Sequence, residues 1–192
     1  FKNHELSGLE ESLARLPEHS KIPIRFEVRS LFDIEGDDPD SAVLVEHTVE
    51  TPWIKDYDAI KGAGPTRWPK RWDITNWGLL AAYVDGQRVA GCVLAHNTDG
   101  VDKLERRDDV VVLWDLRVHP DYRGRGIGRG LFEAAVQWAS DRQCRELKLE
   151  TQNINVPACR FYERQGCRLS SINRSAYEAC PEEVELIWSL AL

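Results

Sequence analysis

The sequence predicts a mixed α/β protein in which a central, mostly antiparallel sheet of about seven strands has helices on both sides. Three observations predict this class. Apolar stretches, some of them with a period of two residues, indicate strands. Two of them, Trp77–Val84 and Arg88–Leu94, meet at Asp85-Gly86, a dipeptide typical of a tight hairpin. Apolar residues spaced three and four apart indicate a helix directly after a glycine-rich turn.

The composition is that of an ordinary folded domain. The chain has 192 residues, 42% of them hydrophobic and 30% charged, so we expect one domain over residues 1–192 with its core over about 77–190. The net charge of −7 argues against a nucleic-acid partner and is compatible with a cationic substrate. The sequence contains no run of 18 apolar residues, so we predict no membrane span. Five cysteines without metal-ligand spacing favour reduced thiols in a cytoplasmic protein, with no metal site.

The N-terminal part is predicted to hold a short helix, two strands and a long aromatic loop. Leucines spaced three and four apart indicate a helix over residues 5–16, ended by Pro17. Strands are expected over Ile22–Phe32 and Ala42–Val49. The tryptophan-containing residues 51–76 have no clear period, so this loop either lines a functional site or covers the sheet as packing.

The most informative stretch runs from Val118 to Gly130 and joins a strand to a helix. The strand, Val110–Val118, is an almost continuous apolar run, as in strands covered on both faces. It stops at His119-Pro120, because proline cannot donate to a sheet ladder. The apolar stripe of the helix begins after Gly126 and ends near Arg142.

The C-terminal part continues with a strand, a helix and two strands. Glu146–Thr151 alternates and is expected to be half-buried. The next helix is predicted to be capped by Asn155 and to stop at Gly166. Two strands, around Arg168–Tyr177 and Val184–Leu190, close the chain.

The turn before the first of these helices has the features of an anion site. Three arginines surround the start of the helix, where the helix dipole disfavours unpaired cations. Three glycines leave backbone N–H groups uncovered. An anion that accepts these groups and pairs with the arginines explains both facts, and a solvated basic turn is the alternative. The residues concerned are Arg123, Gly124, Arg125, Gly126, Gly128 and Arg129.

The spacing of the turn separates it from two common phosphate-binding loops. The lysine of a P-loop is missing, and neither Gly124 nor Gly126 starts a G-x-G-x-x-G fingerprint. What remains, Arg123-x-x-Gly126-x-Gly128, resembles the acetyl-CoA pyrophosphate loop of the GNAT N-acetyltransferase superfamily, whose pattern is Q/R-x-x-G-x-G/A. The order of elements from Trp77 to the last strand, about two-thirds of the chain, also resembles the GNAT fold.

A second stretch resembles the same superfamily. Its pattern is N-x-x-A-x-x-F/L-Y-x-x-x-G-F, and only Cys167 departs from it, in place of the last phenylalanine. The strings Glu-Thr-Gln at 150–152 and Asn-Val-Pro-Ala-Cys at 155–159 resemble antibiotic-modifying members that acetylate streptothricins. The residues that match the superfamily pattern are Asn155, Ala158, Phe161, Tyr162 and Gly166.

The resemblance implies an acetyl-CoA-dependent N-acetyltransferase. In such a reaction an amine attacks a thioester, so one group must take the proton of the amine and another must stabilise the leaving thiolate. By position Tyr162 is the general acid, with a core tyrosine as the alternative. Asp115 and Glu150 are candidate general bases, and either is alternatively a salt-bridged structural carboxylate. The implied cofactor-binding residues are Leu116, Val118, Arg123, Gly124, Arg125, Gly126, Ile127, Gly128, Asn155 and Tyr162.

The substrate that fits best is a small cationic amine, with a streptothricin-type antibiotic as the particular candidate. Aromatic residues interleaved with carboxylates suit a cation that carries apolar surface. A protein or peptide N-acetyltransferase and a non-catalytic acyl-CoA-binding module are the alternatives, and a homodimer is left open. The candidate substrate-binding residues are Trp53, Tyr57, Trp72, Trp77 and Asp115.

Overall fold

The computed structural model describes residues 9–192 and divides into two units. In each unit, segments that are far apart in the sequence come together. Within the described residues, the first unit comprises 9–25, 56–147 and 192, and the second comprises 26–55 and 148–191. This division leaves the expected single domain over residues 1–192 as a prediction.

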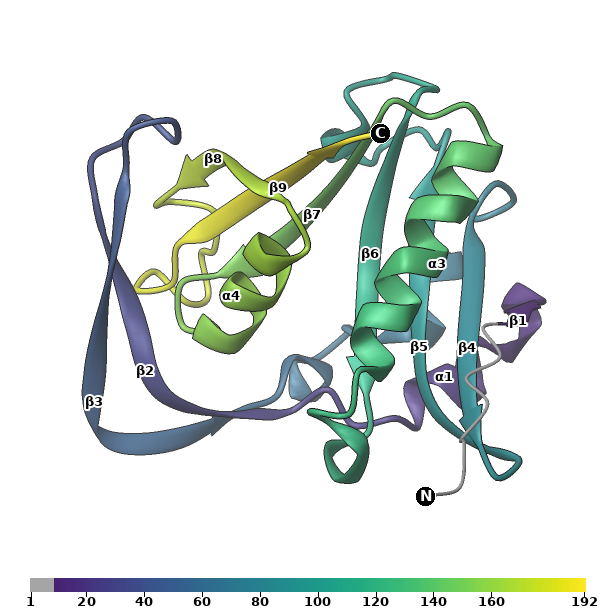
Figure 1. Ribbon diagram of the computed structural model, residues 1–192, viewed down its shortest axis with the longest axis horizontal. Coiled ribbons are helices and arrows are strands. Elements are labelled where there is room, and N and C mark those ends of the chain that lie inside the picture. The colour runs from purple at the N-terminus through teal and green to yellow at the C-terminus, as the bar shows by residue number, and fades with distance from the viewer. Residues whose placement is uncertain (1–8) are drawn as a thin grey trace. The chain divides into compact units, whose positions relative to one another are not determined.

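Four strands of the first unit follow one another in the order β1-β4-β5-β6, and each neighbouring pair is antiparallel (Figure 1). The predicted hairpin is confirmed, because β4 and β5 are joined at Asp85 and Gly86, whose φ angles are 50° and 77°. These strands are β1 (Leu9–Glu11), β4 (Gly78–Val84), β5 (Gln87–His96) and β6 (Val110–Val118).

Helices cover both faces of these four strands, as predicted. On β4, Gly78 lies against Trp138 of α3, and a Cβ at Gly78 would come within 2.6 Å of the indole ring. The next residue, Leu79, points to the opposite face, where it packs with Leu16 of α1. The helical segments of this unit are η1 (Leu13–Arg15), α1 (Leu16–Ser20), η2 (Tyr57–Ala59), η3 (Pro65–Arg67), α2 (Trp68–Arg71), η4 (Asp102–Leu104), η5 (Pro120–Tyr122) and α3 (Ile127–Asp141).

The helix expected over residues 5–16 is wrong in its described part, and residues 5–8 lie outside the described residues. Leu9–Glu11 is a strand, and helical structure begins only with η1 and α1. Pro17 lies in the first turn of α1, where the missing N–H of proline costs nothing. Proline therefore starts this helix instead of ending it.

The aromatic segment of the first unit packs on the sheet. Trp68, Trp72, Trp77 and Trp114 form a cluster whose ring centroids lie 4.9 to 6.4 Å apart. Trp77 is buried, and its indole N–H donates to the hydroxyl of Thr98 over 2.8 Å. The segment therefore serves the core, which is the packing alternative considered for the loop.

Three strands of the second unit follow the order β7-β9-β8, and a separate antiparallel hairpin is made by β2 and β3 (Figure 1). The predicted alternation of β7 is confirmed, because Leu147, Leu149 and Thr151 are buried while the residues between them are half-exposed. The elements are β2 (Phe26–Glu35), β3 (Val43–Lys55), β7 (Glu146–Gln152, which starts at the end of the first unit), α4 (Val156–Arg164), β8 (Arg168–Asn173) and β9 (Glu185–Ala191).

Three strand boundaries differ from the prediction by four residues or more. β2 starts at Phe26, after Pro23, which cannot donate to a ladder. β3 continues to Lys55, so the start of the predicted loop is strand; Pro52 is tolerated because it lies where the register of the hairpin is irregular. β8 ends at Asn173, which leaves Tyr177 in the connection to β9.

A buried asparagine fastens the hairpin to the rest of the second unit. The side chain of Asn153 donates to the carbonyl of Phe32 over 3.0 Å and accepts from the backbone N–H of Val184 over 2.8 Å. The backbone N–H of Phe32 also donates to the carbonyl of Asn153 over 2.9 Å. These bonds hold the turn between β7 and α4, and this turn ends at the predicted site residue Asn155.

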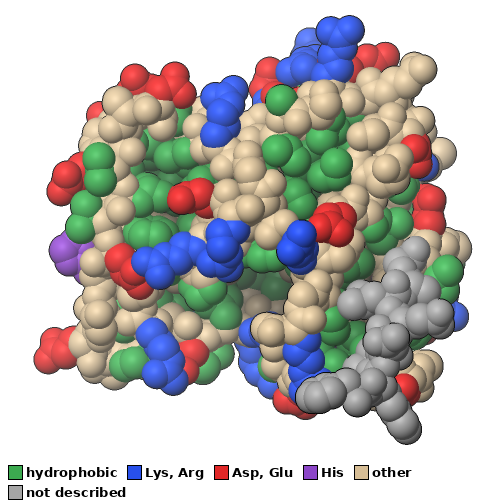
Figure 2. Space-filling view, in the orientation of Figure 1, with side chains coloured by type: hydrophobic (Ala, Val, Ile, Leu, Met, Phe, Trp, Pro, Cys, Tyr) green, Lys and Arg blue, Asp and Glu red, His purple; other side chains and the backbone are tan. Residues whose placement is uncertain are grey.

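The surface and the cysteines have an ordinary character. Acidic and basic side chains are interspersed over the face shown in Figure 2. All five cysteines are free, and only Cys180 is partly exposed, in agreement with the predicted thiols. Within residues 9–192, no helix has both the length and the apolar character needed to cross a bilayer.

Candidate active-site residues

The turn between β6 and α3 presents an uncovered helix N-terminus. Gly124 and Gly126 have φ angles of +75° and +84°, and a Cβ on either would meet no atom within 4 Å. No side chain caps the helix at Gly126, and its first turn contains no acidic residue. Because the first N–H groups of a helix have no partner inside it, this backbone offers donors to an anion.

Arg123 holds this turn in place. Its guanidinium donates to the carbonyl oxygens of Val118, Arg25 and Pro23 over 2.9, 3.1 and 3.3 Å. Three bonds to backbone carbonyls tie the turn to the end of β6 and to the segment before β2. The side chain therefore shapes the loop, which is a different role from the expected ion pair with an anion.

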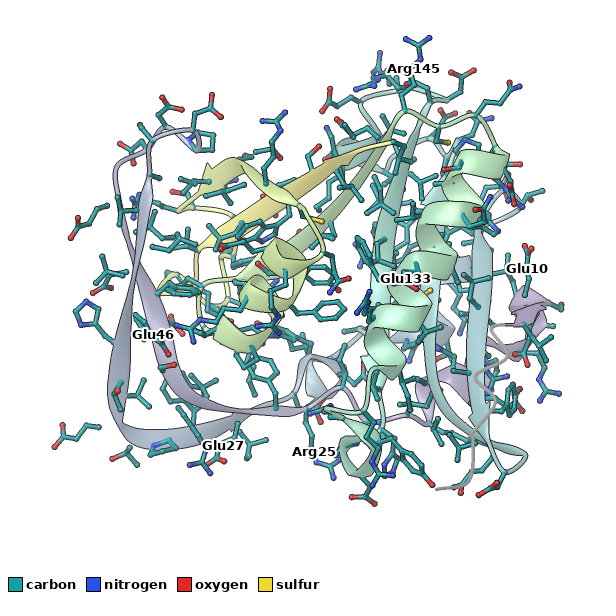
Figure 3. All side chains as sticks on the ribbon, in the orientation of Figure 1. Glu10, Arg25, Glu27, Glu46, Glu133 and Arg145 are labelled. Carbon is teal, nitrogen blue, oxygen red and sulfur yellow. The ribbon has the colours of Figure 1, made fainter. Side chains whose placement is uncertain are left out.

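The other two arginines of the turn have partners of their own. Arg125 lies over the ring of Tyr122, with its guanidinium carbon 5.2 Å from the ring centroid. Arg129 pairs with Glu133, one turn further along α3, over 3.0 Å. Figure 3 labels Glu133 on this helix. An exposed pair of this kind is weak. Both side chains can therefore reorient toward an anion at little cost.

β6 carries an irregularity before the turn. Its register with β5 shifts at Trp114, which makes this residue the extra one of a β-bulge. Leu116 and Val118, whose backbone groups the family resemblance assigns to the cofactor, lie two and four residues further along the strand. The contact of these residues with a cofactor stays a prediction.

Asp115 lies in a buried ion network beside this bulge. Its carboxylate accepts two bonds from Arg117, over 2.9 and 3.0 Å, and lies 2.6 Å from Nε2 of His19. Arg117 also donates to Asp58 over 2.7 Å and to the carbonyl of Ile22 over 3.0 Å. One buried guanidinium thus joins β6, η2 and the segment after α1.

The network decides the charge of Asp115. Burial by itself would raise the pKa of Asp115, but the charge of Arg117 and the bond from His19 outweigh it and hold the pKa well below its usual range. A general base needs a pKa nearer to the working pH. The environment of Asp115 is therefore that of the structural carboxylate considered as the alternative.

Two members of the network, His19 and Arg117, are absent from the site predicted from the sequence. Arg117 did leave a signal, since a charged residue inside an apolar strand needs a buried partner, and Asp115 lies on the same face two residues away. His19 lies 96 residues from Asp115 in the sequence, and no sequence pattern indicated their contact.

The predicted residues of the second unit lie around α4. Asn155 accepts from the backbone N–H of Ala158 over 3.3 Å, so its predicted capping role is confirmed. Tyr162 is 9% exposed, and its ring centroid lies 5.0 Å from that of Phe161. Burial of this kind fits both a core tyrosine and a general acid, so the catalytic role of Tyr162 stays a prediction.

Glu150, on β7, makes a polar cluster with two residues. Oε2 of Glu150 accepts from the hydroxyl of Tyr177 over 2.8 Å and from the amide nitrogen of Gln152 over 3.0 Å. Burial, and then the charge of Glu150, raises the pKa of Tyr177, so the phenol keeps its proton. Tyr177 was not expected in a site, because its segment was predicted to be strand.

The candidate substrate-binding aromatics are distributed over both units. Trp72 and Trp77 share the core cluster of the first unit, and Tyr57 lies in η2 of the same unit. Trp53 belongs to β3 of the second unit, where it is 41% exposed. Exposure leaves Trp53 available for a ligand, whereas Trp77 serves packing.

The acidic residues between these aromatics are used locally. Oδ1 of Asp73 accepts from both the backbone and the hydroxyl of Thr75, and Asp56 accepts from the backbone N–H of Asp58. Asp58 itself pairs with Arg117. The structure therefore supports these carboxylates as binding groups for a cationic substrate less strongly than the sequence pattern did.

One group of described side chains is close enough to share a metal ion, namely Cys180, Glu182 and Glu183. The ammonium of Lys55 lies 2.8 Å from Glu183 and 3.5 Å from the sulfur of Cys180. This cation already neutralises the buried carboxylate, so we assign no metal to the group.

The mixed fold and the uncapped glycine-rich turn define the class as an α/β protein in which the start of one helix offers backbone donors to an anion. The Acetyltransferase (GNAT) family model matches residues 44–167, and the chain belongs to this family. The resemblance predicted from the two motifs is thereby confirmed.

Relatives and a solved structure agree with this assignment. Streptothricin acetyltransferase A of Bacillus subtilis (strain 168) is 34% identical over 112 residues, which cover 56% of this chain and 65% of that protein. Streptothricin acetyltransferase of Escherichia coli is 34% identical over 84 residues, which cover 42% of this chain and 48% of that protein. The chain thus matches less than two thirds of the length of either relative.

The structural neighbour is a Bacillus anthracis str. Ames protein assigned as a streptothricin acetyltransferase, in complex with acetyl coenzyme A. Its TM-score is 0.77 at 23% identity, over 98% of this chain and 100% of that chain. This likeness shows that the two proteins share their fold, and the predicted GNAT fold is confirmed.

The ion network of Asp115 generates a prediction about stability. We expect Asp115→Asn to lower the free energy of unfolding at pH 7 by about 3–5 kcal/mol, because Arg117 would stay buried and charged without its partner. A carboxylate with a depressed folded pKa stabilises the fold above its unfolded pKa of ~3.9 and ceases to do so as the pH falls. The wild-type protein should therefore lose stability more steeply than the variant below about pH 4.

Urea unfolding at several pH values measures both effects. Asp33→Asn is the matched control, because Asp33 pairs with His47 over 3.1 Å on the exposed surface. Its removal should cost less than about 1 kcal/mol. Equal losses in the two variants would contradict a structural role for the buried network.

Proposed function

We propose that this chain transfers an acetyl group from acetyl-CoA to a primary amine of a small cationic substrate. The observation that carries the proposal is the uncapped, glycine-rich start of α3 in a member of the GNAT family. The names of the relatives and the acetyl coenzyme A bound to the structural neighbour support it.

The cofactor would be held mainly by backbone groups. The N–H groups around Gly126 and Gly128 suit the pyrophosphate, with Arg125 and Arg129 available to pair with it. Backbone groups of Leu116 and Val118 beside the bulge suit the amides of the pantetheine arm. Ile127, Gly124 and Arg123 complete the turn, and Asn155 is the candidate contact from α4.

The chemistry needs a base and an acid. A lysine-like amine has a pKa near ~10.4 and is mostly protonated at neutral pH, so a carboxylate must take its proton. Glu150 suits this role better than Asp115, whose charge is committed to Arg117. Tyr162 is the candidate that protonates the thiolate as the carbon–sulfur bond breaks.

Binding of acetyl-CoA tests the turn. We expect Gly126→Glu to abolish binding, because a carboxylate would occupy the space of a phosphate. Gly62→Glu is the matched control, since Gly62 also has a positive φ, +79°, and also lies in open space. Calorimetry should find acetyl-CoA binding in the wild-type protein and in the control. The assignment fails if both glutamate variants bind equally, or if the wild type binds only ATP or NAD.

The role of Tyr162 is tested by removing its hydroxyl. Tyr162→Phe should lower kcat by roughly 10²- to 10⁴-fold and leave the KM for acetyl-CoA little changed, because the phenol acts on the leaving group and not on binding. Steady-state kinetics measure the two constants separately. A variant as fast as the wild type would reduce Tyr162 to a packing residue.

For the particular substrate, we propose a streptothricin-type antibiotic. The names of the relatives and the net charge of −7 support a cationic amine, which an acidic protein attracts. The purified protein should acetylate streptothricin with a kcat/KM of at least about 10⁴ M⁻¹s⁻¹, and its expression should raise the tolerance of a sensitive bacterium. Negligible turnover of streptothricin together with rapid acetylation of a peptide N-terminus would favour the peptide acetyltransferase instead.

A further inference from the structure

We propose that Tyr177 and Gln152 are positioning residues for Glu150, holding its carboxylate in the orientation in which it takes the proton of the amine substrate. The inference rests on the acetyl transfer proposed above and deepens it, because neither sequence motif assigns a chemical role to these two residues.

The three side chains form a closed hydrogen-bonded triangle. The hydroxyl of Tyr177 donates to Oε2 of Glu150 over 2.8 Å, and Nε2 of Gln152 donates to the same oxygen over 3.0 Å. Nε2 of Gln152 also lies 3.0 Å from the hydroxyl of Tyr177. The last torsion of a glutamate is broad when free, so two donors on one oxygen fix the rotation of the carboxylate.

The triangle rests on a rigid strand. Glu150 and Gln152 are two residues apart on β7 and therefore share its half-exposed face. On the opposite face, the indole N–H of Trp188 donates to the hydroxyl of buried Thr151 over 2.8 Å, which fastens β7 to β9. Tyr177 reaches the strand from the connection between β8 and β9. The carboxylate of Glu150 thus projects from β7, which is joined to β9 on its buried face.

The charges suit a proton acceptor. Burial and the charge of Glu150 both raise the pKa of Tyr177, so the phenol acts as a donor over the whole working range of pH. Bonds donated to a carboxylate stabilise its ionised form. The phenol of Tyr177 and the amide of Gln152 are themselves neutral, so they orient the carboxylate of Glu150 through hydrogen bonds and not through charge.

The step balances as a simple group transfer. Glu150 takes one proton from the ammonium of the substrate, and the amine nitrogen then bonds to the acetyl carbonyl carbon. The carbon–sulfur bond breaks, the thiolate takes a proton from Tyr162, and the second amine proton leaves to solvent. An amide and a free thiol result, and both side chains recover their protonation states from water.

The alternative is that the triangle only fastens the connection after β8 to β7. The pH dependence of the rate separates the two roles. Tyr177→Phe keeps the ring and removes one donor to the carboxylate of Glu150. The acid limb of the pH profile of kcat/KM for the amine should therefore shift to a pH about one unit higher. We expect kcat to fall about tenfold with the KM for acetyl-CoA unchanged.

Tyr83→Phe is the matched control. The hydroxyl of Tyr83 also donates to a carboxylate, that of Glu11, but both residues belong to the first unit and lie outside the proposed machinery. This variant should keep the pH limb of the wild type. If Tyr177→Phe folds poorly, Gln152→Met removes the other donor from within the strand, and the same upward shift is required.

A double-variant cycle completes the test. Glu150→Gln should lower kcat by roughly 10²- to 10⁴-fold, and adding Tyr177→Phe should lower it no further, because Tyr177 acts through Glu150. Losses that multiply in the double variant, or an unmoved pH limb in Tyr177→Phe, overturn the inference alone. A wild-type protein that acetylates no amine overturns the proposed function and this inference together.

Discussion

Much of the candidate site depends on backbone N–H groups at the start of α3 that have no partner inside the helix. They stay available because Gly124 and Gly126 adopt positive φ angles and carry no side chain that would cover them. The turn keeps its shape because Arg123 donates to three backbone carbonyls. α3 in turn is fixed on the sheet by the close approach of Trp138 to Gly78. The availability of these N–H groups thus depends on the whole strand–turn–helix unit.

The second constraint is the burial of charge in β6. A buried guanidinium is tolerated only with compensating partners, and Arg117 finds them in Asp115, Asp58 and the carbonyl of Ile22. These partners come from segments far apart in the sequence. The network therefore fixes the segment after α1 and the start of the aromatic segment against the strand that carries Leu116 and Val118.

Local signals explain what the sequence predicts well. The Asp85-Gly86 hairpin, the Asn155 cap and the alternation of β7 each depend on a few neighbouring residues. Pro17 misled the boundary of the first helix, because proline was interpreted as a stop whereas the first turn of a helix accepts it. The tryptophans were ambiguous for a different reason, since an aromatic ring suits a core and a ligand site equally well.

The partners of the two candidate bases separate them, and only some of these partners could be inferred from the sequence. Asp115 and Glu150 both lie on strands and looked equivalent, but Asp115 faces a buried cation whereas Glu150 faces a phenol and an amide. A cation commits the charge of a carboxylate to an ion pair. Neutral donors orient a carboxylate and leave its net charge intact, so that it still attracts and deprotonates an ammonium ion. The two carboxylates thus differ through their partners, of which Arg117 and Gln152 lie two residues away on the same strand, whereas His19 and Tyr177 lie 96 and 27 residues away in the sequence.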